Sequence, residues 1–346
     1  MPKQPGILII RFSAMGDVAM TAPVLREFTA HYPGVKLTVV SRSLFAPFFK
    51  DIPGLQFHAF EPKGKHKGFT GLIKLFLELR RLPVTRVADL HNNLRSRILT
   101  ILFFLCGIKI ARVNKARSEK KQLTRKGNKI LRPLKPVTER YASVFAALGY
   151  PFQLSHRLPP AHPENLSSEL QQLTGAIKNT KWIGVSPFAQ HAQKVYPYHK
   201  METVLVALAN QGYQLFIFGG GEQEKQIARS WAAKHPLISS VIGKVDLEQE
   251  LQLISNLDLM LSMDSSGMHM ASLKGIPVVS IWGATHPYAG FLGYGQSASD
   301  AVQIDLYCRP CSVYGNIPCY RGDLACMNNL SESIVIHTIT HKLNYG

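Results

Sequence analysis

Residues 259–287 read LMLSMDSSGMHMASLKGIPVVSIWGATHP and carry a clear strand–helix–strand pattern. An apolar run comes first, then an acid, two serines, a glycine and a histidine, and the run PVVSIWG lies near the end. Short apolar runs that are separated by a helical pattern predict parallel strands joined by a crossover helix. The stretch therefore predicts a βαβ unit with polar side chains at its strand-to-helix junction.

The same alternation continues on both sides of this stretch. The expected strands lie near residues 7–12, 35–41, 55–60, 84–90, 181–187, 213–221, 240–243, 257–264 and 277–283. Helical patterns separate them, so the predicted fold class is α/β with two Rossmann-like doubly wound domains. Because open α/β sheets bind ligands at the carboxyl ends of their strands, we expect the functional residues on loops after strands, between the two sheets.

A Pro-rich stretch at 156–166, HRLPPAHPENL, predicts the connection between the domains. The chain has 346 residues, which exceeds the size at which one hydrophobic core usually stops growing, so length alone also favours two domains. We place the first domain at 1–165 and the second at 166–330. A tail helix at 331–346 is expected to pack on another part of the fold.

The chain is strongly basic. Forty Lys and Arg residues against 22 Asp and Glu residues give a formal net charge of +18, which predicts an anionic partner: nucleic acid, a phosphorylated substrate or an acidic membrane. The charge gathers at 61–68 and 109–135. Binding of single-stranded nucleic acid would need aromatic side chains among the basic ones, and 109–135 contains none, so we expect no nucleic-acid partner.

No targeting or membrane-spanning segment is expected. The N-terminal apolar run ends at Arg11 and is too short for a signal-peptide core. The longest apolar run, at 98–108, is about half of the ~20 residues that a transmembrane helix requires. It predicts a buried or surface-docking helix in a cytoplasmic protein.

The junction at 264–269 has the composition of a phosphate site. Ser265, Ser266 and Gly267 supply small side chains and backbone N–H groups at the expected start of a helix, where the helix dipole favours an anion. Asp264 either caps this helix or takes part in binding. His269 lies within the first turns and either reaches the same anion or packs in the fold.

Two other loops carry candidate residues. Asp17 follows Gly16, which allows close approach of backbone to a ligand, although an aspartate at this position is also a common helix cap. Ser186 and Lys194 follow an expected strand of the second domain. A lysine there either neutralises a diphosphate or is an ordinary surface residue.

Glu222 and Glu224, after the glycines at 219–221, are candidates for binding a ribose hydroxyl pair. The absence of GxGxxG, GxxxxGK[ST] and HExxH motifs argues against dehydrogenases, P-loop NTPases and zincins. No DxD motif occurs either, which argues against a transferase that holds its donor diphosphate through a metal ion on paired carboxylates. Charge neutralisation would then fall to Lys194 and the helix start.

Four cysteines cluster in the C-terminal region with the spacing C-x2-C-x7-C-x6-C: Cys308, Cys311, Cys319 and Cys326. A four-thiolate zinc or iron–sulfur site is one interpretation, but the later spacings lack the paired-knuckle form. Reduced structural thiols or a labile disulfide are favoured in a cytoplasmic protein. We therefore expect no metal site and no cofactor.

These motifs resemble glycosyltransferase family 9, the ADP-heptose:lipopolysaccharide heptosyltransferases, over nearly the whole chain. The resemblance rests on ILIIRFSAMGDVAMTAPVL at the start, VADLHNNLRS at 87–96, KVYP at 194–197, MDSSGMHMASLKGIPVVSIWGATHP at 263–287, and the Cys-rich segment. It implies a GT-B fold, in which two Rossmann-like domains face a central cleft. It also implies that the first domain binds the acceptor, that the second binds the nucleotide sugar, and that the helix at 331–346 returns to the N-terminal domain.

The resemblance further implies inverting, metal-independent transfer of heptose from ADP-heptose to a lipid A-linked inner-core acceptor of lipopolysaccharide. Asp17 corresponds to the general base and Lys194 to the lysine on the donor phosphate. Inverting transfer requires a base on one side and cations with helix N–H groups on the other, and domain closure is expected to bring them together. The predicted donor-binding residues are Gly16, Ser186, Lys194, Glu222, Glu224, Asp264, Ser265, Ser266, Gly267, His269 and Thr285.

The basic first domain fits such an acceptor. A phosphorylated acidic glycolipid in the anionic inner face of the cytoplasmic membrane would attract the segments 61–68 and 109–135, so a peripheral membrane protein is expected. The predicted acceptor-binding residues are Lys63, Lys65, Lys67, His91, Arg95, Arg97, Lys120 and Lys121.

Two alternatives stay open. DSSGMH has Ser where the family often has Thr or Gly, and KVYP has Val-Tyr where an aromatic residue such as Trp is usual after the basic residue. These departures leave another nucleotide sugar as an alternative donor. A non-catalytic paralogue that binds anionic glycolipids is the other alternative, although the presence of both Asp17 and Lys194 speaks against it. The sequence does not define the oligomeric state.

Overall fold

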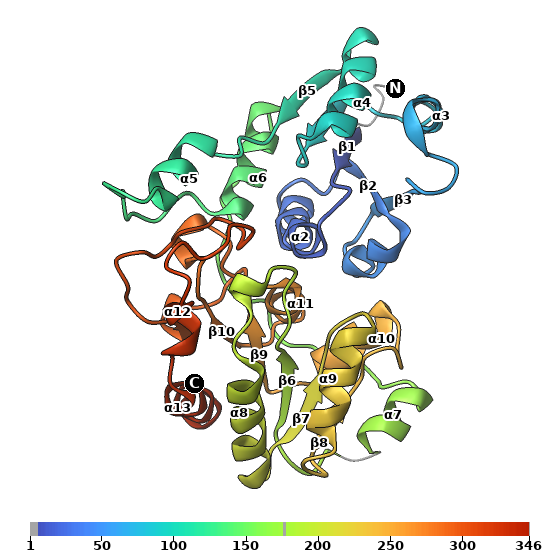
Figure 1. The fold of residues 1–346 in the computed structure, drawn as a ribbon. Helices are drawn as coiled ribbons and strands as arrows, with labels where there is room; N and C mark the ends of the chain where they lie inside the picture. The colour runs from blue at the N-terminus through green and yellow to red at the C-terminus, as the bar shows by residue number, and fades with distance from the viewer. Residues whose placement is uncertain (1–5, 176–177, 346) are drawn as a thin grey trace. The chain divides into compact units, whose positions relative to one another are not determined.

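The computed structural model describes residues 6–175 and 178–345, and the chain divides into two compact units (Figure 1). Unit 1 contains the chain up to Lys115 together with Pro136–His156. Unit 2 contains Ala116–Lys135 and the chain from Arg157 onward. Each unit is built around its own parallel sheet.

The sheet of unit 1 has five strands in the order β3-β2-β1-β4-β5. The strands are β1 (Gly6–Ile10), β2 (Lys36–Arg42), β3 (Leu55–Phe60), β4 (Arg86–Asp89) and β5 (Lys109–Arg112). In the central register, Ile9 pairs with Val39 of β2 and with Ala88 of β4. All five residues of β1 are buried, as expected for a central strand that helices cover on both faces.

Helices cover both faces of this sheet. They are α1 (Met15–Ala19), α2 (Thr21–His31), α3 (Gly68–Arg80), α4 (Leu94–Leu105) and α6 (Val137–Ala147). Leu8 and Ile10 belong to one core cluster with residues of α3 and α4. Helix α2 packs on α6, where the rings of Phe28 and Phe145 lie 4.7 Å apart. No helix within 6–175 and 178–345 combines the length and apolar character needed to cross a bilayer.

The sheet of unit 2 has six strands in the order β11-β10-β9-β6-β7-β8. The strands are β6 (Trp182–Ser186), β7 (Gln214–Ile217), β8 (Ile238–Ser240), β9 (Leu259–Met263), β10 (Val278–Ile281) and β11 (Ala301–Val302). The helices are α5 (Arg117–Thr124), α7 (Ser168–Thr174), α8 (Tyr198–Asn210), α9 (Glu222–Ala232), α10 (Leu247–Ser255), α11 (Ser266–Leu273), α12 (Ala325–Asn328) and α13 (Glu332–Tyr345). The stretch at 259–287 forms β9, α11 and β10, as its pattern predicts.

Two features of the domain prediction need correction. The segment 116–135, expected in the first domain, belongs to unit 2, where Leu123 and Leu134 pack with Ala289. Helix α13, expected to return to the first domain, belongs to unit 2. It packs on α8 and β9 of unit 2, and its buried residues Val335 and Ile339 join the core of that unit.

Candidate functional site

Each sheet has a switch point. The chain first adds strands on one side of the unit's first strand and then continues on the other side of that strand. In unit 1 it lies between β1 and β4, and in unit 2 between β6 and β9. Loops that leave the carboxyl ends of two such strands diverge and leave room for a ligand. Asp17 and His91 follow the strands at the first switch point, and Lys194 and Asp264 follow those at the second.

Asp17 lies on α1 and forms an ion pair with Arg11, which directly follows β1. The Arg11 side chain is only 8% exposed, whereas that of Asp17 is 30% exposed. Arg11 also donates from one terminal nitrogen to the carbonyl of Leu90, at 2.7 Å. The guanidinium therefore holds the carboxylate in place while solvent can still reach it.

The second loop of this switch point is ordered by buried Asp89. Its carboxylate accepts the backbone N–H groups of His91 at 3.0 Å and Asn92 at 2.7 Å, and the hydroxyl of Ser96 at 2.9 Å. His91 Nδ1 accepts the backbone N–H of Phe12 at 3.1 Å. Burial, followed by the charge of Arg11, lowers the pKa of His91 to about 3, so the ring is neutral.

The other predicted acceptor residues of unit 1 lie on the surface. Lys63, Lys65 and Lys67 are exposed on the loop between β3 and α3. Arg95 and Arg97 are exposed in the first turn of α4, and Arg97 Nε donates to Asn92 Oδ1 at 2.9 Å. These five predicted cations thus lie on the β3–α3 loop and in the first turn of α4, and Arg97 contacts the loop that carries His91.

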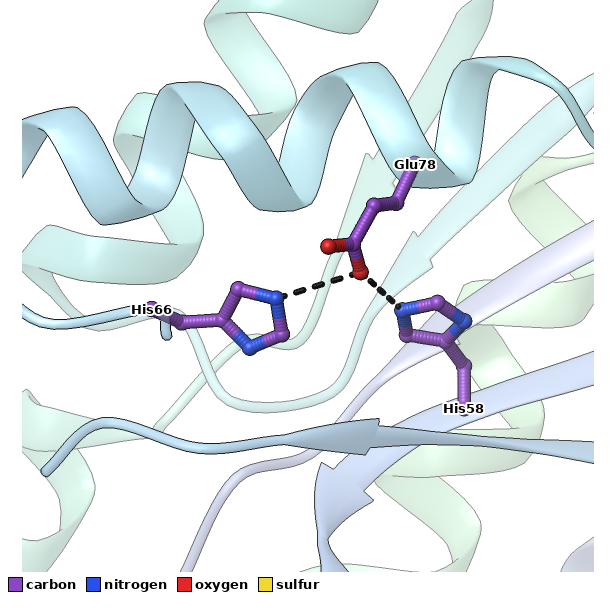
Figure 2. A group of neighbouring side chains, drawn as sticks. All are labelled: His58, His66 and Glu78. Carbon is purple, nitrogen blue, oxygen red and sulfur yellow. Dashed lines mark hydrogen bonds and ion pairs between the residues drawn. The ribbon is translucent and has the colours of Figure 1, made fainter. Parts of the chain in front are cut away.

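A group of side chains beside the basic loop has the composition of a metal site. Figure 2 shows His58 and His66 pointing at Glu78, with their Nε2 atoms 3.1 and 3.2 Å from the same carboxylate oxygen. However, His66 Nδ1 accepts the backbone N–H of Glu61, so the neutral ring carries its proton on Nε2 and offers no lone pair there. Lys65 Nζ also lies 3.5 Å from that oxygen. We interpret this group as a clamp that ties the basic loop to α3.

The last two predicted acceptor residues lie in unit 2, on α5. Lys120 is buried, and its ammonium lies 4.4 Å from the ring centroid of Phe291 and 5.2 Å from that of Tyr314. The sequence predicts that Lys120 binds the acceptor, whereas the structure buries its ammonium against these two aromatic rings. Lys121, its neighbour, is exposed.

In unit 2, Lys194 and Asp264 meet at the switch point. Lys194 ends a short 3₁₀ helix after β6 (Ala192–Lys194), and its Nζ lies 3.0 Å from Asp264 Oδ2. The two side chains are only 16% and 7% exposed. The lysine is therefore held in place at the carboxyl ends of β6 and β9.

The start of α11 lies at the same place. Ser265 is its N-cap residue but makes no side-chain capping bond, so the first N–H groups of the helix have no such partner. The Ser265 hydroxyl lies 3.5 Å from that of Ser186 and 3.4 Å from that of Ser262. At Gly267, a Cβ atom would lie 2.3 Å from Ser186 Cβ, so only glycine lets the helix start approach β6 this closely.

The loop after β10 borders this group. The backbone N–H of Ala284 donates to the carbonyl of Gln193, next to Lys194, at 3.4 Å. Thr285 is buried, and within the described chain its hydroxyl has no hydrogen-bond partner. His269 is also buried, on α11. The structure therefore brings Ser186, Lys194, Asp264, Ser265, Ser266 and Gly267 together, with Thr285 on the adjoining loop.

The remaining predicted donor residues, Glu222, Glu224 and Gly16, lie on α9 and α1, and not on the segments that form the group around Lys194. Glu224 accepts the backbone N–H of Gly220 at 2.7 Å and so shapes the glycine loop before α9. Glu222 is exposed in the first turn of that helix. Gly16 lies in unit 1, directly before Asp17, and not in the unit that holds the other donor candidates.

Sequence reasoning missed three side chains that organise these loops: Arg11, Asp89 and Ser262. Each lies in or directly after an apolar strand, where a polar residue is unexpected. The charge within ILIIRF and the aspartate that ends VAD were available signals, because a buried charge needs a partner.

Comparisons with known proteins identify the family of the chain. The model of the family "Glycosyltransferase family 9 (heptosyltransferase)" matches residues 72–318. Lipopolysaccharide heptosyltransferase 3 of Escherichia coli is 25% identical over 281 residues, which cover 78% of this chain and 81% of that protein. The lipopolysaccharide core heptosyltransferase OpsX of Haemophilus influenzae is 23% identical over 286 residues, with 81% and 80% covered.

Solved structures show the same fold. A glycosyltransferase family 9 protein of Veillonella parvula has a TM-score of 0.75 at 18% identity, with 100% of this chain and 99% of that chain covered. The E. coli heptosyltransferase WaaC with ADP has a TM-score of 0.66 at 17% identity, with 97% and 99% covered.

Two parallel, doubly wound sheets and the similarity to heptosyltransferase structures define the GT-B fold, the fold class that the sequence predicts, and the family match makes the chain a glycosyltransferase. The extent of the family match identifies the enzyme further. The chain belongs to glycosyltransferase family 9, the heptosyltransferases, which confirms the resemblance seen in its motifs.

Proposed function

We propose that this enzyme transfers heptose from ADP-heptose to a lipid A-linked inner-core acceptor of lipopolysaccharide, with inversion and without a metal ion at the diphosphate. The observation that carries the proposal is the group around Lys194, where a cation, seryl hydroxyls and a helix start converge at one switch point. ADP-heptose is supported as the donor because WaaC has been solved with ADP and with ADP-2-deoxy-2-fluoro heptose. Lipopolysaccharide is supported because the curated relatives are named for it.

The donor would bind with its diphosphate at the start of α11. The free N–H groups of the first turn and the hydroxyls of Ser186 and Ser265 offer donors to phosphate oxygens, and the helix dipole favours the anion. Lys194, paired with Asp264 directly before this helix start, supplies a cation there. On donor binding its ammonium would be shared between Asp264 and the diphosphate, so Asp264 acts as a positioning residue for the lysine.

The acceptor would bind to unit 1 with its hydroxyl at Asp17. The carboxylate takes the proton of that hydroxyl as the oxygen attacks the anomeric carbon. The bond between the anomeric carbon and the diphosphate oxygen breaks, and its electron pair leaves with ADP. Lys194 and the N–H groups of α11 stabilise the negative charge that develops on the departing diphosphate. The products are the inverted glycoside, ADP and a proton.

Acceptor-dependent ADP release tests this proposal. The purified protein is incubated with ADP-heptose, UDP-glucose or GDP-mannose in the presence of a chelator, with and without a deacylated lipid A-type acceptor. We expect ADP to be released from ADP-heptose at least tenfold faster with the acceptor than without it.

Each alternative has its own outcome in this assay. Acceptor-dependent release from another nucleotide sugar would keep the fold and mechanism but replace heptose. No release from any donor, together with retained binding of the acceptor, would favour the non-catalytic glycolipid-binding paralogue. Activity that disappears with chelator and returns with added Mg²⁺ would contradict metal-independent transfer.

We also propose that unit 1 docks on the anionic inner face of the cytoplasmic membrane. One side of α4 exposes an apolar stripe at helical spacing, formed by Leu94, Ile101, Phe104 and Leu105, with exposed fractions of 76%, 51%, 68% and 75%. Arg95 and Arg97 lie on the same helix. Exposed apolar side chains combined with cations are typical of surfaces that insert into anionic lipid headgroups.

Changing Phe104 and Leu105 to serine is expected to weaken vesicle binding at least tenfold. The reason is that an inserted Phe or Leu side chain contributes about 1.5–3 kcal/mol when it is fully buried, and about 1.4 kcal/mol corresponds to a tenfold change. Co-sedimentation with phosphatidylglycerol-containing vesicles measures the effect. Ile334→Ser, at a half-exposed residue of α13 in unit 2, is the matched control and should bind as the unchanged protein does. Equal losses in both variants would contradict docking through α4.

A further inference from the structure

The four clustered cysteines of unit 2 line one small cavity. Cys308, Cys311, Cys319 and Cys326 all contribute to its wall, although they are spread over 19 residues of sequence from 308 to 326. All four are free thiols, and Cys308 and Cys326 are buried. The sequence alone favours reduced structural thiols, but four thiols around one cavity are the ligand set of a tetrahedral metal site.

The segment that carries these thiols lacks regular structure. No helix or strand lies between the end of β11 at Val302 and the start of α12 at Ala325. Loops of this length are uncommon in compact domains unless they are functional or held by other means. A bound cation supplies such a means, because it ties distant points of the loop together.

Positive charge borders the same cavity. The guanidinium of Arg309 is buried and donates to backbone carbonyls, among them that of Trp282 at 3.1 Å, and to Gln303 Oε1 at 2.7 Å. Its hydrogen-bond partners are neutral, and the carboxylate that acts on its charge is that of Asp305. Lys129 Nζ donates to the carbonyls of Cys308 and Pro310. These partners are neutral carbonyl and amide oxygens, so a negative charge in the cavity would be stabilised by the buried Arg309 and the half-buried Lys129.

We propose that Cys308, Cys311, Cys319 and Cys326 bind one structural divalent cation, zinc or iron(II), as four thiolates. Binding releases four protons: M²⁺ and four thiols give a tetrathiolate complex of charge −2 and four H⁺, with no change of oxidation state. The negative charge of the complex would lie beside Arg309 and Lys129. In the described chain no three of these sulfurs lie within 4.8 Å of one another. Tetrahedral zinc needs sulfurs about 3.8 Å apart, since Zn–S is about 2.3 Å, so the loop contracts when the cation binds.

The cation would steady the loops of the donor group. Cys311 donates its backbone N–H to the carbonyl of Ala284 at 3.0 Å, beside Thr285, and Arg309 donates to the carbonyl of Thr285 at 3.1 Å. Gly315, between Cys311 and Cys319, packs closely on Lys194. A Cβ atom at this position would lie 2.5 Å from Lys194 Cγ. This effect on donor binding rests on the proposed function, whereas the cation site itself does not. The cation takes no part in sugar transfer.

Metal analysis of the untagged protein tests the site without any transfer assay. The protein, purified under reducing and anaerobic conditions, is incubated with Zn²⁺ or Fe²⁺, passed through a desalting column and analysed by element-resolved mass spectrometry. We expect about one metal ion per chain, and after addition of Co²⁺ in its place, the sulfur-to-cobalt charge-transfer absorption of a tetrathiolate.

Variants locate the cation. Cys319→Ser changes a half-buried ligand and should leave folding intact, whereas Cys308→Ser changes a buried one. Both variants are expected to lose at least nine-tenths of the bound metal in competition with a chelator. Cys106→Ser changes the exposed cysteine after α4 and should retain it. Full metal content in both ligand variants would overturn the proposal. So would five free thiols with no bound metal after incubation, a disulfide among the four, or acid-labile sulfide, which marks an iron–sulfur cluster.

Discussion

Asp17→Asn is expected to lower kcat by about 10²- to 10⁴-fold, which is the range that a positioned general base contributes. Asparagine has the size of aspartate and still accepts a hydrogen bond from Arg11, but it cannot take the proton of the acceptor hydroxyl. The binding of donor and acceptor should therefore change little. Steady-state ADP release at saturating substrates measures kcat, and calorimetric titration of ADP and of the acceptor measures binding.

A second carboxylate of unit 1 provides the matched control. Glu27 lies on α2, and its side chain accepts the backbone N–H and the hydroxyl of Ser155 at 2.8 and 2.7 Å. Glu27→Gln removes a charge of the same sign from the same unit, away from the switch point, and kcat should stay within about twofold. If Asp17→Asn transferred heptose at the unchanged rate with binding intact, Asp17 would not be the base.

The fold could be predicted to the extent that local pattern determines it. The strands β9 and β10 are short apolar runs with a helical pattern between them, so the spacing of apolar residues alone predicts a βαβ unit. The assignment of α5 and α13 to a unit could not be predicted in this way. It depends on which part of the fold the apolar face of each helix packs against, and that part can lie far away in sequence. The buried residues Val335 and Ile339 of α13, for example, join the core that contains residues of α8.

The candidate site was predictable where chemistry and position coincide. Asp17, Lys194 and Asp264 are polar residues on the segments that follow strands β1, β6 and β9, and these strands border the two switch points. Partners across the fold were not predictable, because they come from far along the chain. Lys120 illustrates this: its aromatic contacts, Phe291 and Tyr314, lie more than 170 positions away, so a basic run that looks exposed in sequence contains a buried lysine.

Lys194→Met is expected to lower kcat/KM for the donor by about 10²- to 10³-fold, the loss that follows removal of one electrostatic contact to a developing negative charge. Methionine keeps much of the side-chain length but not the charge, and it leaves Asp264, 7% exposed, without its cation. The affinity for ADP should fall as well, because an unpaired carboxylate then faces the diphosphate. Lys200→Met is the matched control, since Lys200 is also 16% exposed and pairs with Glu332 at 3.2 Å in the same unit.

The double variant Lys194→Met/Asp264→Asn separates loss of attraction from added repulsion. If Asp264 repels the diphosphate once its cation is gone, the double variant should bind ADP more tightly than Lys194→Met alone, and the coupling between the two changes measures that repulsion. Loss of one partner of a buried pair also destabilises the fold, by as much as 3–5 kcal/mol, so unfolding by urea must be followed for each variant. If Lys194→Met bound ADP as tightly as the unchanged protein does, Lys194 would not contact the diphosphate. A loss of fold stability could lower the affinity for ADP, but it could not replace the binding energy of a lost contact.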